Sequence, residues 1–366
     1  GILSLKEKGS IVLSMWKSYP PTNVIRSLKT LEAASFNMNN ALVLSTIQTT
    51  HIIAPRSDLE PQSISSLTSF AKGSGANLDS AEKYIVKNDS DFLREFKTSP
   101  THDDKPYFYN FLPLKHILRF FFPTSESSVD LSRTHMDAGY LYLWLSLFIS
   151  ILVGFLVMIL PLLINSFLSS QKTPYPRLLS NIYFCCLGIG FMLLEISFIE
   201  RLQSIVEHKS YSLAVVLFCF LVFAGFGSLS FNWWQRFTGF KYMNMALLFV
   251  FIAAYGLLLN LGWGSLSNLL RVGSFSQRIC ILISILAPLS FALGLPFVTG
   301  LKYMISEAEQ QVAWAWASNG FSSVVGAILA RILTIQLGFN TTCEVACGLY
   351  VLAGLVFVLQ QKRLPT

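Results

Sequence analysis

Glu195 is the residue whose chemistry stands out first, because it lies inside an apolar segment, Leu178 to Arg201 (LLSNIYFCCLGIGFMLLEISFIER). A membrane-spanning helix needs about 20 apolar residues, at a rise of roughly 1.5 Å each. An ionisable carboxyl near the centre of such a helix costs about 2.5 to 3.5 kcal/mol, so it usually faces protein or water. Glu195 is therefore a candidate functional residue.

A second intramembrane charge, Arg331, is a potential partner for Glu195. We predict that the segments Leu178 to Ile199 and Val312 to Leu337 end on the same side of the membrane, which places both charges roughly 8 Å below one interface. This depth predicts an ion pair between Glu195 and Arg331, with Glu344 as the competing partner. The alternative is that each charge reaches the interface separately. Asn319, in AWAWASNGF, fits a hydrogen bond between helices better than a substrate contact.

Asp103 and Asp104 form a carboxylate pair in THDDKPYFYNFLPL, directly before Lys105 and Pro106. Paired carboxylates can act as general acid and base when their pKa values separate. In a loop beside a lysine and a proline, a turn cap or a salt-bridged corner is the better interpretation. The sequence identifies no catalytic, cofactor-binding or metal-binding residue, because it contains neither a glycine-rich turn between a strand and a helix nor a zinc-like cysteine spacing.

The composition is that of an integral membrane protein. Of 366 residues, 53% are hydrophobic and 13% are charged, and the mean hydropathy is +0.54. Soluble domains carry about 25% charged residues. The formal net charge of +7 belongs almost entirely to the apolar part, where basic loops between helices account for it, so nothing indicates a nucleic-acid partner.

We predict a transmembrane domain of seven helices over residues 140–366. Short connections predict that consecutive helices are antiparallel neighbours. The predicted spans are Leu141 to Phe167, Leu178 to Ile199, Leu213 to Leu229, Met243 to Leu261, Ile279 to Thr299, Val312 to Leu337 and Cys343 to Gln360. Basic residues in the short loops are more frequent on the side opposite the polar region, which favours placing that opposite side in the cytoplasm.

Glycines and prolines inside the spans indicate how the helices pack. Gly188 with Gly190, and Gly225 with Gly227, predict surfaces for close helix approach. Pro296, after Gly294 and Leu295, either kinks its span or opens a discontinuous helix of the kind that lines transporter sites.

Residues 1–122 read as a partial α/β domain, and residues 123–139 as a polar linker. We predict a strand over Ser10 to Trp16, a helix from Thr22 or Asn23 to about Phe36, and a hairpin of Ala41 to Ile47 with Thr50 to Ala54. A helix follows Pro61 and stops at Gly73, and Ser80 to Lys97 reads as one or two short amphipathic helices. This order is that of the closing half of a doubly wound sheet.

Several motifs in order resemble the C-terminal region of the bacterial spermidine-synthase-like integral membrane proteins. The membrane motifs are GIGFMLLEISFIERL, HKSYSLAVVLFCFLVFAGFGS, LPFVTGL and AWAWASNGFSSVVGAILA. The polar motifs KGSIVLSMW, PPTNVIRSLKTLEA and THDDKPYFYNFLP are similar to the end of that family's methyltransferase-like domain, which makes Asp103, Asp104 and Lys105 part of a domain-closing segment. His208 to Tyr211 and Pro296 to Gly300 depart from the family's usual loop sequences.

The resemblance implies a class I S-adenosylmethionine-type sheet and a bacterial inner membrane. It also implies that the nucleotide-binding residues and the catalytic aspartate of an aminopropyltransferase or methyltransferase would precede Gly1. No cofactor is therefore expected on this chain alone, and S-adenosylmethionine or its decarboxylated form only with an upstream domain. Such an enzyme belongs in the cytoplasm, whereas the loop charges favour the other side for the polar region, so the orientation stays open.

Three functions follow from these observations. In the first, the chain is a structural or accessory subunit in the lipid bilayer. Its half-sheet packs on other protein subunits or on an upstream domain, because an incomplete sheet exposes an edge that needs cover. Alternatively, it is the C-terminal part of a longer membrane-bound transferase. The third reading is a small-solute transporter that uses Glu195, Arg331 and a helix break at Pro296.

Overall fold

The computed structural model describes residues 9–18, 21–86, 96–107, 110, 138–168, 178–206, 209–238, 242–305 and 309–361. The chain divides into two compact units, Gly1–Tyr142 and Leu143–Thr366. The first is a small unit with a four-stranded antiparallel sheet, and the second is a helical unit. The linker predicted at residues 123–139 lies, except for its last two residues, outside the described part.

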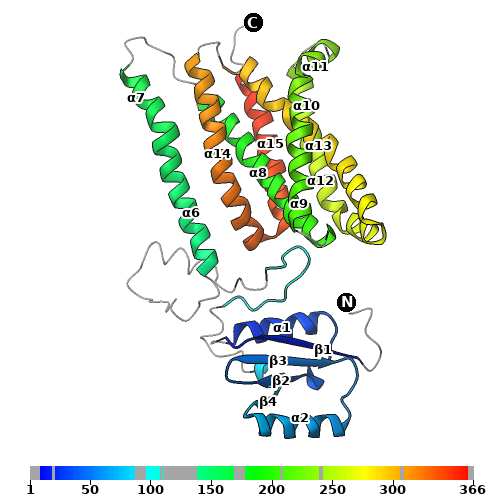
Figure 1. Cartoon of the computed structure of the whole chain (residues 1–366). Coiled ribbons are helices and arrows are strands. Elements are labelled where there is room, and N and C mark those ends of the chain that lie inside the picture. Colours follow the sequence, from blue (N-terminus) through cyan, green and yellow to red (C-terminus); the bar gives the residue numbers. More distant parts are fainter. Residues whose placement is uncertain are drawn as a thin grey trace. The chain divides into compact units, whose positions relative to one another are not determined.

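The small unit follows the predicted order through its first three strands (Figure 1). The sheet has the order β1-β3-β2-β4, and all neighbouring strands are antiparallel. β1 and β2 therefore run in the same direction, joined through α1, with β3 between them. The elements are β1 (Ser10–Trp16), α1 (Thr22–Ala33), η2 (Met38–Asn40), β2 (Leu42–Ser45), β3 (Thr49–Pro55), α2 (Pro61–Ser74), β4 (Asn77–Ser80) and α3 (Glu82–Val86).

The core of the small unit lies between α1 and one face of the sheet. Val24 and Leu28 of α1 are almost fully buried against Val43 of β2 and Ile52 of β3. On β1 the side chains alternate between half-buried and exposed, as expected for a strand with one covered face. The apolar stripe of α1 therefore decides which face of the sheet is covered.

The segment after α2 differs from the sequence-based prediction. α2 continues through Gly73 to Ser74, and Gly75, whose φ of 67° is left-handed, caps its end. The next four residues, NLDS, form β4 against β2, although their sequence lacks the alternation of a typical strand. Only Glu82–Val86 of the predicted helical region Ser80 to Lys97 is helical within the described residues, and residues 87–95 lie outside them.

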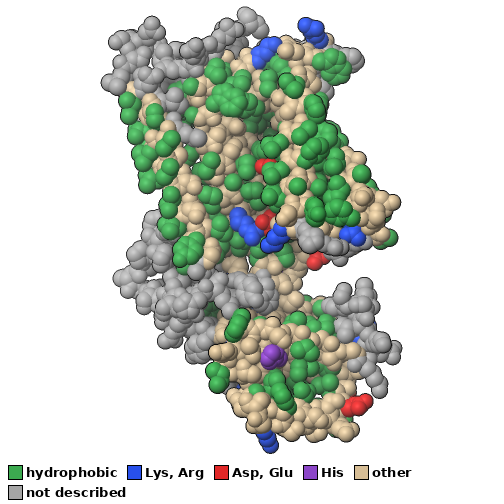
Figure 2. Space-filling model, viewed as in Figure 1, with side chains coloured by type: hydrophobic (Ala, Val, Ile, Leu, Met, Phe, Trp, Pro, Cys, Tyr) green, Lys and Arg blue, Asp and Glu red, His purple; other side chains and the backbone are tan. Residues whose placement is uncertain are grey.

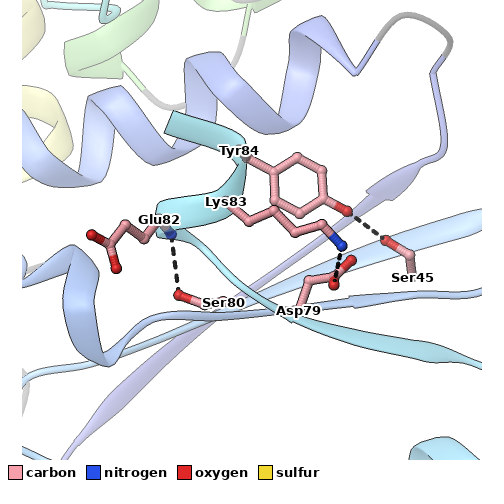
Figure 3. Close-up of polar contacts among 6 residues, drawn as sticks. All are labelled: Ser45, Asp79, Ser80, Glu82, Lys83 and Tyr84. Atoms are coloured by element: carbon pink, nitrogen blue, oxygen red, sulfur yellow. Dashed lines mark hydrogen bonds and ion pairs between the residues drawn. The ribbon is translucent and has the colours of Figure 1, made fainter. Parts of the chain in front are cut away.

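Side chains fix the corner between β4 and α3 (Figure 3). The amide of Glu82 donates a hydrogen bond to Oγ of Ser80 (3.3 Å), and Lys83 forms an ion pair with Asp79. Tyr84 reaches back to Ser45 of β2, with 3.5 Å between the two hydroxyl oxygens. These contacts hold the short helix over the end of β4.

Within the described residues, seven helices are long and apolar enough to cross a membrane, as the hydropathy of the sequence predicts (Figure 1). The first and third spans each contain a π-helical turn, which divides them into shorter elements. The elements are α6 (Ala138–Gly154), η6 (Phe155–Ile159), α7 (Leu160–Leu168), α8 (Leu178–Val206), α9 (Lys209–Phe218), η7 (Cys219–Phe223), α10 (Ala224–Leu229), α11 (Phe231–Thr238), α12 (Tyr242–Val272), α13 (Phe275–Tyr303), α14 (Glu309–Leu337) and α15 (Phe339–Gln361).

The helix at the centre of this unit is α8. Its most apolar stretch is 61% buried, whereas that of the first span is 11% buried. α8 packs chiefly against α14 and α15, and the largest buried side chains of the unit include Tyr183, Phe184 and Phe198 of this helix. A helix that is apolar all round is buried by its neighbours, and α8 takes that position.

The prolines inside the spans do not break the helices that contain them. α13 continues through Pro288 and Pro296, so the discontinuous helix considered for Pro296 is wrong. Tyr183 of α8 donates a hydrogen bond to the carbonyl of Pro296 (2.6 Å). Pro161 follows directly after η6, in which the amide of Leu160 donates to the carbonyl of Phe155, five residues earlier. The wider π-turn absorbs the missing proline donor.

Glycines bring two helix pairs into backbone contact. A Cβ atom at Gly227 of α10 would overlap the carbonyl of Phe291 in α13, and a Cβ at Gly294 of α13 would overlap the carbonyl of Ala224 in α10. Gly188 approaches α14 and Gly190 approaches Tyr350 of α15 in the same manner.

Gly225 does not share this role. No atom lies within 4 Å of a Cβ built there. The prediction of close packing at Gly225 is wrong, because two residues along a helix turn the Cβ direction by about 200°. The side of α10 that meets α13 therefore carries Gly227 but not Gly225.

We predict that Gly227→Ala lowers the apparent melting temperature of the purified protein in detergent, whereas Gly225→Ala leaves it unchanged. The added methyl group at Gly227 meets backbone atoms that cannot rotate away, and overpacking of this kind costs about 1–3 kcal/mol or more. Equal effects of the two substitutions would show that α10 and α13 do not approach as described.

Candidate functional site

Arg331 is paired with Glu200 and not with Glu195. The guanidinium of Arg331 on α14 forms an ion pair with the carboxylate of Glu200 on α8. α8 continues to Val206, seven residues beyond the predicted end of the span, which moves Glu195 about 10 Å deeper at roughly 1.5 Å per residue. Glu200 and Arg331 each lie six residues before the end of their helices. The predicted partner of Arg331 is wrong because the sequence-based end of α8, at Ile199, comes seven residues too early.

Glu195 is buried alone. Its side chain is 4% exposed, and it forms no hydrogen bond or ion pair with any residue that the structure describes. It lies on the side of α8 that also carries Phe184, Phe191 and Phe198. These rings pack against α13 and η7. The carboxyl group is thus placed within the bundle, toward the fifth and third spans.

The other predicted polar residues have separate locations. Glu344 is exposed on α15 and forms no ion pair with Arg331 in the described part of the chain. The side-chain amide of Asn319 on α14 donates to the carbonyl of Phe184 on α8 (3.2 Å), which is the hydrogen bond between helices that the sequence predicts. Asn319 therefore contributes to the packing of α8 on α14.

Sequence reasoning missed a buried cation, Arg201. Its guanidinium is 3% exposed and donates to the side-chain oxygens of Asn260 on α12 and Asn340 on α15, the latter at 2.7 Å. The guanidinium also lies 5.5 Å from the centre of the Trp263 ring, which suits a cation–π contact. Arg201 lies two residues beyond the predicted end of its span at Ile199, and the continuation of α8 to Val206 places it on the helix, turned toward α12 and α15.

The charged side chains of the helical unit are few on the face shown in Figure 2, with basic side chains at both its upper and its lower end. The visible face is largely hydrophobic, and red acidic atoms appear within it and next to blue basic atoms near its lower end. Charged side chains in a membrane-embedded bundle usually face the protein interior or water. The part of α8 between Glu195 and Arg201 is therefore the candidate functional site.

Asp103 and Asp104 form a turn of the small unit. His102 and Lys105 bridge across them, with the amide of Lys105 donating to the carbonyl of His102 (2.8 Å). Burial lowers the pKa of Lys105, the charge of Arg26 lowers that pKa further, and Asp104 opposes this shift. The turn interpretation therefore holds.

Arg26 of α1 fixes the segment that contains this turn. Its guanidinium donates to the carbonyls of Asn110 (2.9 Å), Tyr107 (3.3 Å) and Lys97. Three main-chain carbonyls on one buried guanidinium hold the segment against the helix. The arrangement closes the small unit.

A metal site of the usual kind is not evident. Among the residues that the structure describes, no group of three or more His, Cys, Asp or Glu side chains could hold a metal ion. The six cysteines are free thiols, and four of them are buried in the bundle. The polar chemistry of the unit thus rests on Glu195, on the Glu200–Arg331 pair and on Arg201.

A double-mutant cycle tests the revised ion pair. We expect Glu200→Gln and Arg331→Gln to be coupled by about 0.5–1.5 kcal/mol in unfolding measurements in detergent, because intramembrane polar contacts average about 0.6 kcal/mol. The cycle of Glu195→Gln with Arg331→Gln should give no coupling. Coupling in the second cycle and not in the first would contradict the pairing.

We also predict that Asn260→Leu destabilises the bundle through Arg201. The substitution removes an acceptor from a buried guanidinium, which costs about 1.5–3 kcal/mol. Ser267→Ala, on the same helix, is the control, because the Ser267 hydroxyl is exposed and donates only to its own helix at Gly264. A melting temperature of Asn260→Leu equal to that of the control would show that Asn260 does not support Arg201.

Comparison with known proteins assigns neither a family nor a function to this chain. No family model, no curated protein and no solved structure matches this chain. The resemblance to spermidine-synthase-like membrane proteins therefore stays a prediction from the sequence motifs. The described residues contain seven helices that are long and apolar enough to cross a bilayer and a small antiparallel sheet, which is compatible with an integral membrane protein.

Proposed function

We propose that this chain is an accessory subunit of the spermidine-synthase-like membrane proteins, in which the seven-helix domain anchors a small transferase-type sheet that packs on a protein partner. The membrane domain supplies the anchor in the lipid bilayer. The sheet supplies the docking surface. On this proposal the chain binds no nucleotide by itself, and its role is to hold a partner domain at the membrane.

The order of the strands supports the transferase-type assignment. β1 and β2 are parallel, are joined through α1 and have β3 inserted between them as an antiparallel strand. A parallel crossover through a helix is the basic unit of doubly wound sheets. The closing end of such a sheet can carry an antiparallel strand. The small unit is therefore compatible with the terminal part of a larger sheet.

The observation that carries the docking proposal is the edge strand β1. Within the described residues β1 pairs only with β3, so its other edge offers unpaired backbone groups. Two large apolar side chains of this strand are exposed, Val12 at 58% and Trp16 at 67%. Soluble proteins usually protect such edges with charges, prolines or bulges. A long apolar edge strand, in contrast, suits the addition of another strand.

The second candidate is a longer membrane-bound aminopropyltransferase or methyltransferase of which these residues are a part. In that case the segment on β1 belongs to the same polypeptide and supplies the S-adenosylmethionine site. The same edge strand supports both candidates, so the experiment must identify the polypeptide that covers it.

Photo-crosslinking in native membranes tests the proposal. A photoreactive phenylalanine analogue at Trp16 should crosslink to protein, and mass spectrometry of the product should identify a separate polypeptide. The matched control is the analogue at Phe70, which is 61% exposed on α2, a helix that packs beside β4 at the opposite edge. We expect no protein crosslink there.

The outcomes separate the candidates. A crosslink from Trp16 into a sequence continuous with this chain supports the longer transferase. Crosslinks to lipid alone, or equal protein crosslinking from Trp16 and Phe70, would contradict docking at β1.

A further inference from the structure

Several polar side chains inside the bundle have no hydrogen-bond partner among the described residues, and two of them, Glu195 and Ser290, come from helices that pack on each other. Ser197 of α8 is a third, but it points about 200° away from Glu195 around the helix. Glu195 on α8 is 4% exposed, and Ser290 on α13 is fully buried with no hydrogen bond to its hydroxyl. A buried hydroxyl without a partner costs about 1–3 kcal/mol. A buried carboxylate costs more. Two such groups in one bundle call for an explanation through an occupant.

The packing of α8 on α13 brings these groups to facing surfaces. The rings of Phe184 on α8 and Phe297 on α13 meet edge to face, with 5.5 Å between their centres. Glu195 follows Phe184 by eleven residues, and Ser290 precedes Phe297 by seven. These spacings are close to three and two full helical turns, so each polar residue shares the face of its ring.

The depths of the two groups also agree. Arg278 of α13 donates to the carbonyl of Ile205 on α8 (3.1 Å), which with the pair of rings shows that the helices run antiparallel. By this register Ser290 lies about one turn from Glu195, in the direction of the α8 N-terminus. Helical side chains lean toward the N-terminus of their helix. The Glu195 carboxyl therefore leans toward the level of Ser290.

The π-turn η7 lies at the same depth. Its Phe220 ring packs on Phe191 (5.5 Å) and on Phe198 (6.2 Å), which flank Glu195 by about one turn on either side. A π-turn inserts one residue into the helix, so one carbonyl loses its regular amide donor, and such turns are frequent at functional sites. From this general geometry we expect η7 to offer a backbone oxygen at this level of the bundle.

The neighbouring cations are engaged elsewhere. Arg331 is paired with Glu200, and Arg201 points to Asn260 and Asn340 on the other side of α8. Neither of these contacts involves Glu195. An ionised carboxyl at Glu195 is therefore balanced by no positive charge of the described residues.

We propose that Glu195, Ser290 and η7 form a binding site for a monovalent metal cation, of which Na⁺ is the representative. Oxygen donors of carboxylate, hydroxyl and carbonyl type suit hard cations. Divalent cations usually gather several carboxylates, whereas one carboxylate balances one positive charge. The phenylalanine rings around Glu195 lower the local polarity, which strengthens the attraction between a carboxylate and a cation.

Thermal unfolding of the purified protein in detergent tests this site, with NaCl compared to choline chloride at equal ionic strength. A ligand that binds only the folded state raises the melting temperature in a saturable manner. We expect wild type to melt at least about 2 °C higher in Na⁺ than in choline. Glu195→Gln and Ser290→Ala should abolish this difference.

Matched variants keep the test specific. Glu344→Gln removes an exposed carboxylate, and Ser284→Ala removes a hydroxyl that donates to Cys280 of its own helix (2.8 Å). Both should retain the full Na⁺ effect. If Glu195→Gln does not fold, Ser290→Ala against Ser284→Ala decides the question alone.

Three results would overturn the proposal: an equal melting temperature of wild type in Na⁺ and in choline, a Na⁺ effect that persists in Ser290→Ala, or stability that depends on pH through Glu195 but not on Na⁺. The last result would assign Glu195 to a proton instead of a metal cation.

Discussion

The structure of the helical unit depends on the cost of a charged group in a lipid bilayer. α8 carries Glu195, Glu200 and Arg201 within seven residues of an otherwise apolar helix. Each charge would cost several kcal/mol if it faced lipid. The helix avoids this cost because other helices surround it. Its central position is thus a requirement of its own sequence.

The three charges are handled in three different ways, because successive residues of a helix point about 100° apart. Glu200 meets a basic partner on α14, and Arg201 meets two amide oxygens from α12 and α15. Glu195 meets neither. The first two arrangements tie helices together through named partners on α14, α12 and α15. Glu195 is the group for which packing alone offers no compensation.

Close backbone contact makes these arrangements possible. Gly188 and Gly326 let α8 and α14 approach until side chains such as Asn319 reach the opposite backbone. Gly227 and Gly294 do the same for α10 and α13. Between transmembrane helices there is little hydrophobic driving force, because lipid is as apolar as the side chains. Contact area and interhelical hydrogen bonds must therefore supply the free energy of helix association. The glycines are therefore part of the energetics of the polar groups.

The sequence was sufficient for the broad features and insufficient for the register. Hydropathy identified seven spans, because a bilayer imposes a length and an apolar composition that few other structures share. Strand and turn signals identified β1, α1 and the β2–β3 hairpin. Helix ends were less certain, because IERLQSIV is polar enough to resemble a loop, yet it continues α8. That error of seven residues misassigned the partner of Arg331 and concealed Arg201.

Errors at Gly225 and β4 have a similar origin. A glycine in a span indicates a possible contact, but its direction around the helix depends on the neighbouring helix. The strand β4 pairs through its backbone with β2, and backbone pairing leaves little trace in a sequence such as NLDS. Tertiary context decides both features.

The irregular points of the bundle bear on how an ion site can arise. Many transporters bind ions where a helix is broken and its carbonyls are exposed. Here α13 keeps its helical path through two prolines, and no broken helix occurs in the described part of that span. The irregularity is found in π-turns instead, and η7 lies at the depth of Glu195. A π-turn exposes one carbonyl while the helix on either side stays intact. Such a site suits a bound ion that stabilises the bundle, because no half-helix is available to move as a gate.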